Sequence, residues 1–266
     1  MRKPMAAQDN ASRDEARART ASAEEIPRLL SSPDPAVLLA LVENPELNEQ
    51  HAEILLRRAD LPPAVLAALA THPALSASYA VRRDIVLHPH APRLVALRWV
   101  RQLYLFDLVR LTLLPSAHAE LKRIAEDTLV ARLPQVPQGQ KLTLARRASG
   151  RVAAALLAEG VPPVVRLALD NPFLAEGHLL QLLARDELAS HVVTAIAEHP
   201  RWVRLPGVRL ALVRHPATPS VRVRALLPDL ALHELRDLLA LGRLRPERRQ
   251  MLEQEIARRA PSGRPR

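Results

Sequence analysis

The sequence predicts an all-α protein, a right-handed α-solenoid of short helices built as a tandem duplication. Three observations lead to this prediction: apolar residues recur at helical spacing, Asn-Pro or His-Pro dipeptides separate the apolar stretches, and the intervals between these dipeptides repeat. The alternation of apolar and polar residues that marks strands is absent, and β-formers other than Val are scarce. We therefore expect stacked helices throughout the chain.

The duplication is visible in the spacing of the dipeptides, because the two intervals between their prolines recur in the same order in each half of the chain. An offset of 127 in the numbering, which carries Pro45 onto Pro172, aligns 35–133 with 162–260 without a gap, and more than a quarter of the aligned positions are identical. A match of this length indicates an internal repeat. The dipeptides are Asn44-Pro45, His72-Pro73, His88-Pro89, Asn171-Pro172, His199-Pro200 and His215-Pro216.

Each copy is predicted to contain six or seven short helices. The residues Ala52, Leu55, Leu56 and Ala59 follow the i, i+3, i+4, i+7 pattern of one helix face. Proline is tolerated in the first turn of a helix and excluded from its interior, so prolines before apolar runs predict helix starts. Asn or His before Pro predicts a helix end, because the residue before Pro is disfavoured in the α region. The predicted start prolines are Pro35, Pro62, Pro63, Pro92, Pro162 and Pro219.

These signals divide the chain into five segments. Copy 1 is predicted at 26–133 and copy 2 at 153–260, packed as one continuous body. Residues 134–152 are a bridge, with a Pro/Gln/Gly-rich turn followed by a helix around Lys141–Ala148. Residues 1–24 and 261–266 are polar and are predicted to be a disordered leader and tail.

The repeated pattern is an apolar helix, Asn-Pro or His-Pro, a polar turn and a second apolar helix, as in LALVENPELNEQHAEILLRRA and VRLALVRHPATPSVRVRALL. This pattern resembles that of bacterial leucine-rich-repeat-variant and HEAT-like α-helical repeat proteins. The resemblance covers about residues 26–260. It implies a solenoid in which short helices bury a shared apolar seam. Some relatives of the variant repeat hold an iron–sulfur cluster on cysteines, and this feature does not carry over because the chain has no Cys.

Composition excludes several classes of protein. Without Cys the chain has no disulfide framework, thiolate zinc site or cysteine nucleophile. Only 7 of 266 residues are Gly, which leaves little for phosphate-binding loops. The polar N-terminal stretch lacks the apolar core of a signal peptide, and no apolar run is long enough to span a bilayer, so we expect a cytoplasmic protein without membrane contact.

No catalytic or metal-binding set of residues emerges, and we predict no cofactor and no metal. His51/His178, His72/His199 and His88/His215 repeat between the copies, but Asn replaces His in the equivalent Asn44 and Asn171 turns, which favours a capping role over metal ligation. His233-Glu234 starts like a zinc-protease motif but lacks the second His. A HEAT-like DNA glycosylase remains a third hypothesis, with Trp202, Asp229 and Asp237 in a basic stretch.

The net charge of +10 is concentrated in the second half of the chain. Residues 1–133 hold 17 basic and 16 acidic residues, whereas 134–266 hold 21 and 12. An acid-free stretch, 199–228, contains six arginines, of which copy 1 shares only one, as Arg82. They can form a surface for nucleic acid or an acidic protein, or be an ordinary solvated face of an Arg-rich protein. These arginines are Arg201, Arg204, Arg209, Arg214, Arg222 and Arg224.

Half of the six aromatic residues, Trp99, Tyr104 and Phe106, lie close together in copy 1. We favour a core or packing-seam role for them, because large aromatics mainly supply buried area. The alternative is a hydrophobic groove for a partner helix.

These observations predict a non-catalytic scaffold or adaptor that binds a protein partner, and not an enzyme. The alternative is a nucleic-acid-binding protein that contacts the duplex backbone through the arginines of copy 2. The scarcity of aromatics disfavours recognition of single strands, which relies on base stacking.

Overall fold

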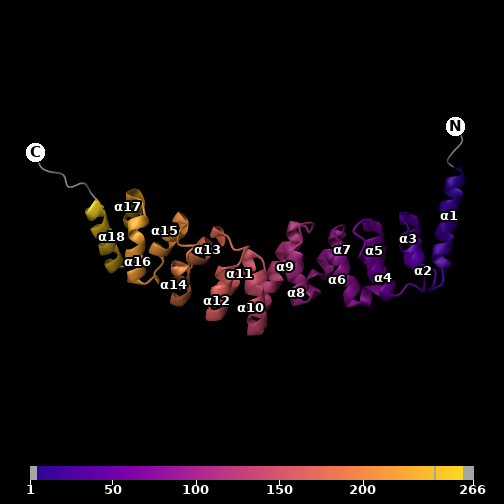
Figure 1. Ribbon diagram of the computed structural model, residues 1–266, viewed down its shortest axis with the longest axis horizontal. Helices are drawn as coiled ribbons and strands as arrows, with labels where there is room; N and C mark the ends of the chain where they lie inside the picture. Colours follow the sequence, from indigo (N-terminus) through magenta and orange to yellow (C-terminus); the bar gives the residue numbers. More distant parts are fainter. Residues whose placement is uncertain (1–4, 243, 260–266) are drawn as a thin grey trace, which may run out of the picture. The chain divides into compact units, whose positions relative to one another are not determined.

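The computed structural model of the chain describes residues 5–242 and 244–259, and side chains from residue 13 onward. The regular structure of these residues is entirely helical, with eighteen α-helices and four short 3₁₀ segments (Figure 1). The all-α prediction is thus confirmed for the described part of the chain. The predicted tail 261–266 and leader residues 1–4 lie outside it.

The chain divides into two compact units, unit 1 (Met1–Leu129) and unit 2 (Val130–Arg266). The helices of unit 1 are α1 (Met5–Thr20), α2 (Ile26–Leu29), α3 (Pro35–Val42), α4 (Glu49–Leu56), α5 (Pro63–Thr71), α6 (Tyr79–Leu87), α7 (Arg93–Trp99), α8 (Leu105–Leu113) and most of α9 (Ala119–Arg132), with 3₁₀ segments η1 (Leu75–Ala77) and η2 (Val100–Gln102).

Unit 2 continues with a second helical series. Its elements are η3 (Leu133–Gln135), α10 (Gln138–Arg147), α11 (Gly150–Glu159), α12 (Pro162–Leu169), α13 (Glu176–Leu183), α14 (Ser190–Glu198), α15 (Pro206–Arg214), α16 (Ser220–Leu226), η4 (Leu227–Asp229), α17 (Leu232–Ala240) and α18 (Pro246–Arg259).

Helix boundaries in the two units correspond at the same offset that relates the two sets of dipeptides. The helices α3 to α9 begin and end at positions whose counterparts begin and end α12 to α18, and η2 corresponds in the same way to η4. The local signals that start and stop helices therefore act alike in both halves of the chain.

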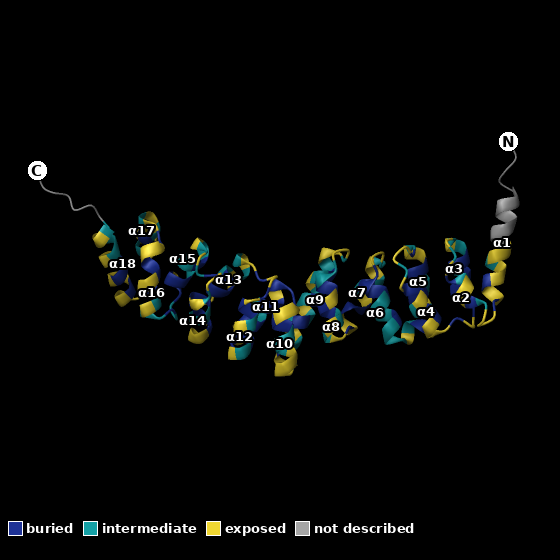
Figure 2. Cartoon of the chain, viewed as in Figure 1, coloured by how far each residue is buried: buried dark blue, intermediate teal, exposed yellow. Residues whose placement is uncertain are grey.

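Within each unit, helices two apart in the chain pack side by side. In unit 1, α3 packs against α1 and α5, while α6 packs against α4 and α8. In unit 2, α12 packs against α10 and α14, while α13 packs against α11 and α15. Each unit thus has two layers of alternating helices, and the apolar stripe of each helix is buried between them (Figure 2).

The predicted start and stop signals are found at helix ends. Pro35, Pro63 and Pro162 are the first residues of α3, α5 and α12, and Pro62, Pro92 and Pro219 immediately precede helices. His72, His88, His199 and His215 each directly follow a helix, and Asn44 and Asn171 come two residues after one. Local chemistry therefore accounts for most of the boundaries.

Two asparagines of the Asn-Pro turns are buried and connect neighbouring helices. Asn44 Nδ2 donates to the carbonyls of Ala18 (2.8 Å) and Ala21 (2.9 Å) at the end of α1. Asn171 Nδ2 donates to Ala145 O (2.8 Å) and Ala148 O (3.0 Å) at the end of α10. The carbonyl groups at the end of a helix lack intrahelical partners, so each amide satisfies groups that burial would otherwise leave unpaired.

The structure differs from the sequence prediction at two of the predicted segment boundaries. Residues Met5–Thr20, expected to be disordered, form α1, with Ala18 buried under α3. The bridge contains α10, close to the predicted helix, but the predicted start of copy 2 at residue 153 falls inside α11. The composition of the leader did not predict α1, because most residues of this helix are polar and the helix is stabilised by packing against α3.

Of the described helices, none is both long enough and apolar enough to cross a lipid bilayer.

Candidate binding groove

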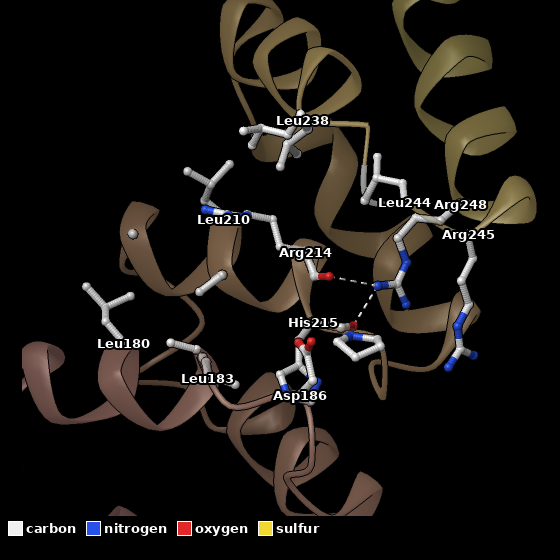
Figure 3. A pocket seen from close by; sticks show the side chains of 15 residues that line it. Leu180, Leu183, Asp186, Leu210, Arg214, His215, Leu238, Leu244, Arg245 and Arg248 are labelled. Atoms are coloured by element: carbon white, nitrogen blue, oxygen red, sulfur yellow. Dashed lines mark hydrogen bonds between the residues drawn. The ribbon is translucent and has the colours of Figure 1, made fainter.

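Unit 2 contains a groove of about 860 Å³ on one side of its helices (Figure 3). Helices α13, α15 and α17 supply its walls, and the α17–α18 turn and the start of α18 supply one end. The lining residues are Leu180, Leu183, Ala184, Asp186, Gly207, Leu210, Ala211, Arg214, His215, Pro216, Leu238, Leu241, Leu244, Arg245 and Arg248.

The groove has an apolar lining that comes from several helices. Leu183 and Leu238 are buried, Leu180 and Leu210 are half-buried, and Leu241 is 54% exposed. These side chains belong to helices that are far apart in sequence, and each helix has its backbone groups engaged in its own hydrogen bonds. The helical walls of the groove therefore offer mainly side-chain contacts to a ligand.

Arg248, at one end of the groove, is a buried cation held by neutral partners. Its guanidinium donates to the carbonyls of Val213 (3.1 Å), His215 (2.5 Å) and Thr218 (2.8 Å), so it caps the end of α15. Figure 3 shows its hydrogen bonds to the carbonyls of Arg214 (3.4 Å) and His215. Burial lowers the pKa of Arg248, and the positive charge of Arg245 lowers it further. The charge of Arg248 is thus satisfied in hydrogen bonding but not neutralised by an ion pair among the described residues.

Two further arginines lie at the groove. Arg214 extends beside Leu210, and Arg245 lies on the α18 side near Arg248 (Figure 3). Both side chains are exposed, and neither has an ion-pair partner in the described part of the chain. Among the described lining residues, Asp186 is the one acid against three arginines, so the groove combines leucine and alanine side chains with an excess of positive charge.

The equivalent face of unit 1 has different chemistry. In the alignment of the two halves, the counterparts of Leu180, Leu210 and Ala211 are Glu53, Arg83 and Asp84. Arg83 Nε donates to Asp84 Oδ1 at 2.7 Å, and a second bond joins the same two side chains. This hydrogen-bonded pair raises the pKa of Arg83, and the charges of Asp107 and Glu53 act in the same direction. Unit 1 therefore has charged, mutually paired side chains where unit 2 has leucine and alanine.

The six arginines singled out from the sequence do not share one helix face. Arg209 and Arg214 are five positions apart on α15, and Arg222 and Arg224 are two apart on α16, spacings that place side chains on different sides of a helix. Arg201 and Arg204 lie in the α14–α15 turn. Arg214 alone belongs to the groove.

Three of the other five have partners within unit 2. Arg209 pairs with Asp229 at 3.4 Å, Arg222 pairs with Glu198, and the Arg201 guanidinium lies 4.1 Å from the ring centre of Trp202. Arg204 and Arg224 are exposed, with no ion pair among the described residues.

Trp202 is part of the core. It is 1% exposed, and its indole Nε1 donates to Leu169 O at 2.8 Å. A ring in this position is not available for stacking on a flipped base. Asp229 is engaged by Arg209, and no group of three or more potential metal ligands occurs among the described residues.

The three aromatic residues of unit 1 are divided between core and surface. Trp99 is 4% exposed, whereas Tyr104 and Phe106 are 65% and 48% exposed. Tyr104 stacks on Tyr79 with ring centres 3.9 Å apart, and the Tyr79 hydroxyl donates to Asp107 Oδ2 at 2.5 Å. Tyr104 and Phe106 therefore lie on the surface, and Tyr104 is one ring of a stacked tyrosine pair.

Sequence reasoning found Arg214 but missed the leucines of the groove and Arg245 and Arg248. A signal for these residues was present in the alignment of the two halves of the sequence. Positions where the halves differ in charge, such as His118 and Arg245 or Leu121 and Arg248, are those the shared fold does not dictate. Leu180 and Leu210 would also have been found by looking for positions that are charged in the first half, as Glu53 and Arg83 are, and apolar in the second.

Comparison of the chain with protein-family models, with curated proteins and with solved structures found no match.

Proposed function

We propose that this chain is a non-catalytic helical-repeat protein that binds another protein through the groove of unit 2. The observation that carries the proposal is the groove of about 860 Å³, in which Leu180 and Leu210 are partly exposed and Leu241 is 54% exposed. Contiguous apolar surface rimmed by polar residues is typical of interaction sites, because leaving it in water is unfavourable. We place the protein in the cytoplasm, as expected from its sequence.

The proposal includes the architecture that presents this groove. We infer that the two units arose by duplication of one helical-repeat segment and that each is a short α-solenoid of the HEAT-like or leucine-rich-repeat-variant kind. The matching helix ends and the side-by-side packing of alternate helices support this inference. The equivalent hydrogen bonds of Asn44 and Asn171 extend it to α1 and α10.

A photo-crosslinking experiment in the cells of origin tests the proposed function. p-Benzoylphenylalanine replaces Ala184, an exposed residue of the groove margin, in the full chain. The matched control places it at Arg57, which is the exposed equivalent in unit 1. We expect a reproducible protein adduct at position 184 and none of the same mass at position 57.

A second control changes the groove by introducing residues that stand at the equivalent positions of unit 1. The double variant Leu210→Arg and Ala211→Asp copies the Arg83–Asp84 pair of unit 1 and should abolish the adduct at position 184. Adducts that persist in this variant, adducts to nucleic acid only, or no adduct at all would contradict the proposal.

A further inference from the structure

The charge of the groove determines which partner suits it. The described lining residues include three arginines, Arg214, Arg245 and Arg248, and one acid, Asp186. The hydrogen-bond partners of the buried Arg248 are all carbonyl groups. Arg245 and Arg248 repel one another, because both are cations and they are close in space. A carboxylate placed between or beside them would relieve this repulsion and form charge-assisted hydrogen bonds.

The apolar lining limits the occupant further. Leu180 of α13 and Leu210 of α15 are partly exposed, and Leu241 after α17 is exposed, so the groove offers apolar side-chain contacts that a phosphate cannot use. A nucleic-acid backbone would leave this apolar surface without a complementary group, whereas the apolar face of a protein segment would bury it.

The backbone of the groove favours a helical occupant over an extended one. An extended peptide exposes unpaired N–H and C=O groups that need partners such as the edge of a sheet, and the described part of this chain has no strand. The carbonyls at the end of α15, which could otherwise accept, are already used by Arg248. An α-helix satisfies its own backbone and needs only side-chain contacts.

We propose that the groove of unit 2 takes an acidic amphipathic helix of a partner protein. Apolar residues at i, i+3 or i+4, and i+7 of that helix fill the space between α13, α15 and α17. Asp or Glu residues beside this stripe pair with Arg214 and Arg245. This inference rests on the proposed function of the groove and adds the chemical class of the partner.

Selection from a displayed library of random peptides, each long enough for several helical turns, tests the inference on the full chain. The chain is immobilised, and binders that also bind the Leu210→Arg, Ala211→Asp variant are removed. We expect the remaining peptides to combine apolar residues at helical spacing with an excess of Asp and Glu. Remaining peptides without an acidic excess, peptides with alternating or proline-rich patterns, or no enrichment would overturn the inference.

A charge-reversal series with one selected peptide provides the second readout, measured by fluorescence anisotropy. The Arg214→Glu, Arg245→Glu variant should bind it at least about tenfold more weakly, and a peptide with Lys in place of each acid should regain affinity for this variant. Arg224→Glu is the matched control, an exposed arginine on α16 outside the groove, and should change affinity less than about twofold.

The two proposals fail in different ways. If crosslinking at position 184 yields a groove-dependent protein but charge reversal leaves peptide affinity unchanged, the proposed function stands and the acidic helix is wrong. If crosslinking yields no groove-dependent protein, the proposed function itself is wrong.

Discussion

Unit 1 and unit 2 have the same helices but different surfaces on the same layer. Where unit 1 has Glu53 and the Arg83–Asp84 pair, unit 2 has Leu180, Leu210 and Ala211, and where unit 1 buries Leu87 and Leu121, unit 2 has Arg214 and Arg248. The fold accepts both sets. The helical framework therefore does not dictate the residue type at these positions, and their difference between the units supports a role in binding.

The framework itself is almost unchanged between the units. His88 Nε2 contacts Arg58 O at 2.7 Å, and His215 Nε2 contacts Arg185 O at 2.9 Å. In both histidines Nδ1 accepts a backbone N–H two residues later, which leaves Nε2 as the donor. Both ring nitrogens of His88 and His215 are thus used by the backbone, which gives these two His-Pro turns the same structural role in the two units.

The largest expected effect is at a core position where the units differ. Trp202 in unit 2 corresponds to Leu75 in unit 1, and both are buried. Trp202→Ala should lower the free energy of unfolding by about 3–5 kcal/mol, because it leaves a cavity and an unpaired Leu169 carbonyl. Urea unfolding followed by circular dichroism measures the change.

The control for this variant is Trp202→Leu, which introduces the residue of unit 1. It should destabilise less than Trp202→Ala, because leucine fills part of the ring volume. A cost below about 1 kcal/mol for Trp202→Ala would contradict the core role of this ring.

The next largest effect should be the same in both units. Asn44→Ala and Asn171→Ala each remove an amide that binds two carbonyls and accepts one backbone N–H, all part of a buried turn. We expect a loss of roughly 3 kcal/mol in each case, because buried polar groups are left unpaired. Urea unfolding gives the loss, and hydrogen exchange detected by mass spectrometry assigns it to α3 or α12.

A large difference between the two asparagine variants would break the equivalence of the units. Asn44→Asp and Asn171→Asp serve as the matched controls, since they keep the shape and the acceptor oxygen but lose the two donated bonds. They should be destabilising as well.

A third prediction concerns a feature that unit 1 has and unit 2 lacks. Burial and the hydrogen bond to Asp107 raise the pKa of Tyr79 to about 12, from an ordinary value of 10.0. Because the folded-state pKa is the higher one, this stabilisation is complete below pH 10.0 and is lost as the pH rises through about 12. Absorbance of tyrosinate in a Tyr104→Phe variant measures Tyr79 alone, since the chain has only 2 tyrosines.

The variant Asp107→Asn provides the control for the titration. It removes the negative charge beside the hydroxyl, so the pKa of Tyr79 should fall toward its ordinary value. An unchanged titration midpoint would rule out the Asp107 contact as a cause.

The smallest effect is expected at surface contacts that differ between the units. Arg93 pairs with Glu120 at 2.6 Å in unit 1, whereas the equivalent Ser220 donates to Glu247 at 3.0 Å in unit 2. Arg93→Ser should change the free energy of unfolding by less than about 1 kcal/mol, because exposed ion pairs are weak. The difference should shrink further at high NaCl concentration, and a cost that grows with salt would contradict an electrostatic origin.

Much of the helical framework could be predicted from local residues. Prolines predicted the starts of α3, α5, α7, α12 and α16, since the missing N–H and fixed φ act within one turn. The helix α1 could not be predicted in this way, because its residues are largely polar and it is stabilised by contact with α3 and Asn44. Local propensity carries no information about a partner that is more than twenty residues away.

The sequence by itself determined the helical class and the matching boundaries of the two halves, because capping and proline geometry are short-range effects that repeat wherever the residues repeat. Only the tertiary structure decided which arginines matter together. Arg214 from α15, Arg245 from the α17–α18 turn and Arg248 from α18 line one groove with leucines of α13 and α17. A run of arginines in the sequence is instead divided among different helix faces, since a helix turns by about 100° with each residue.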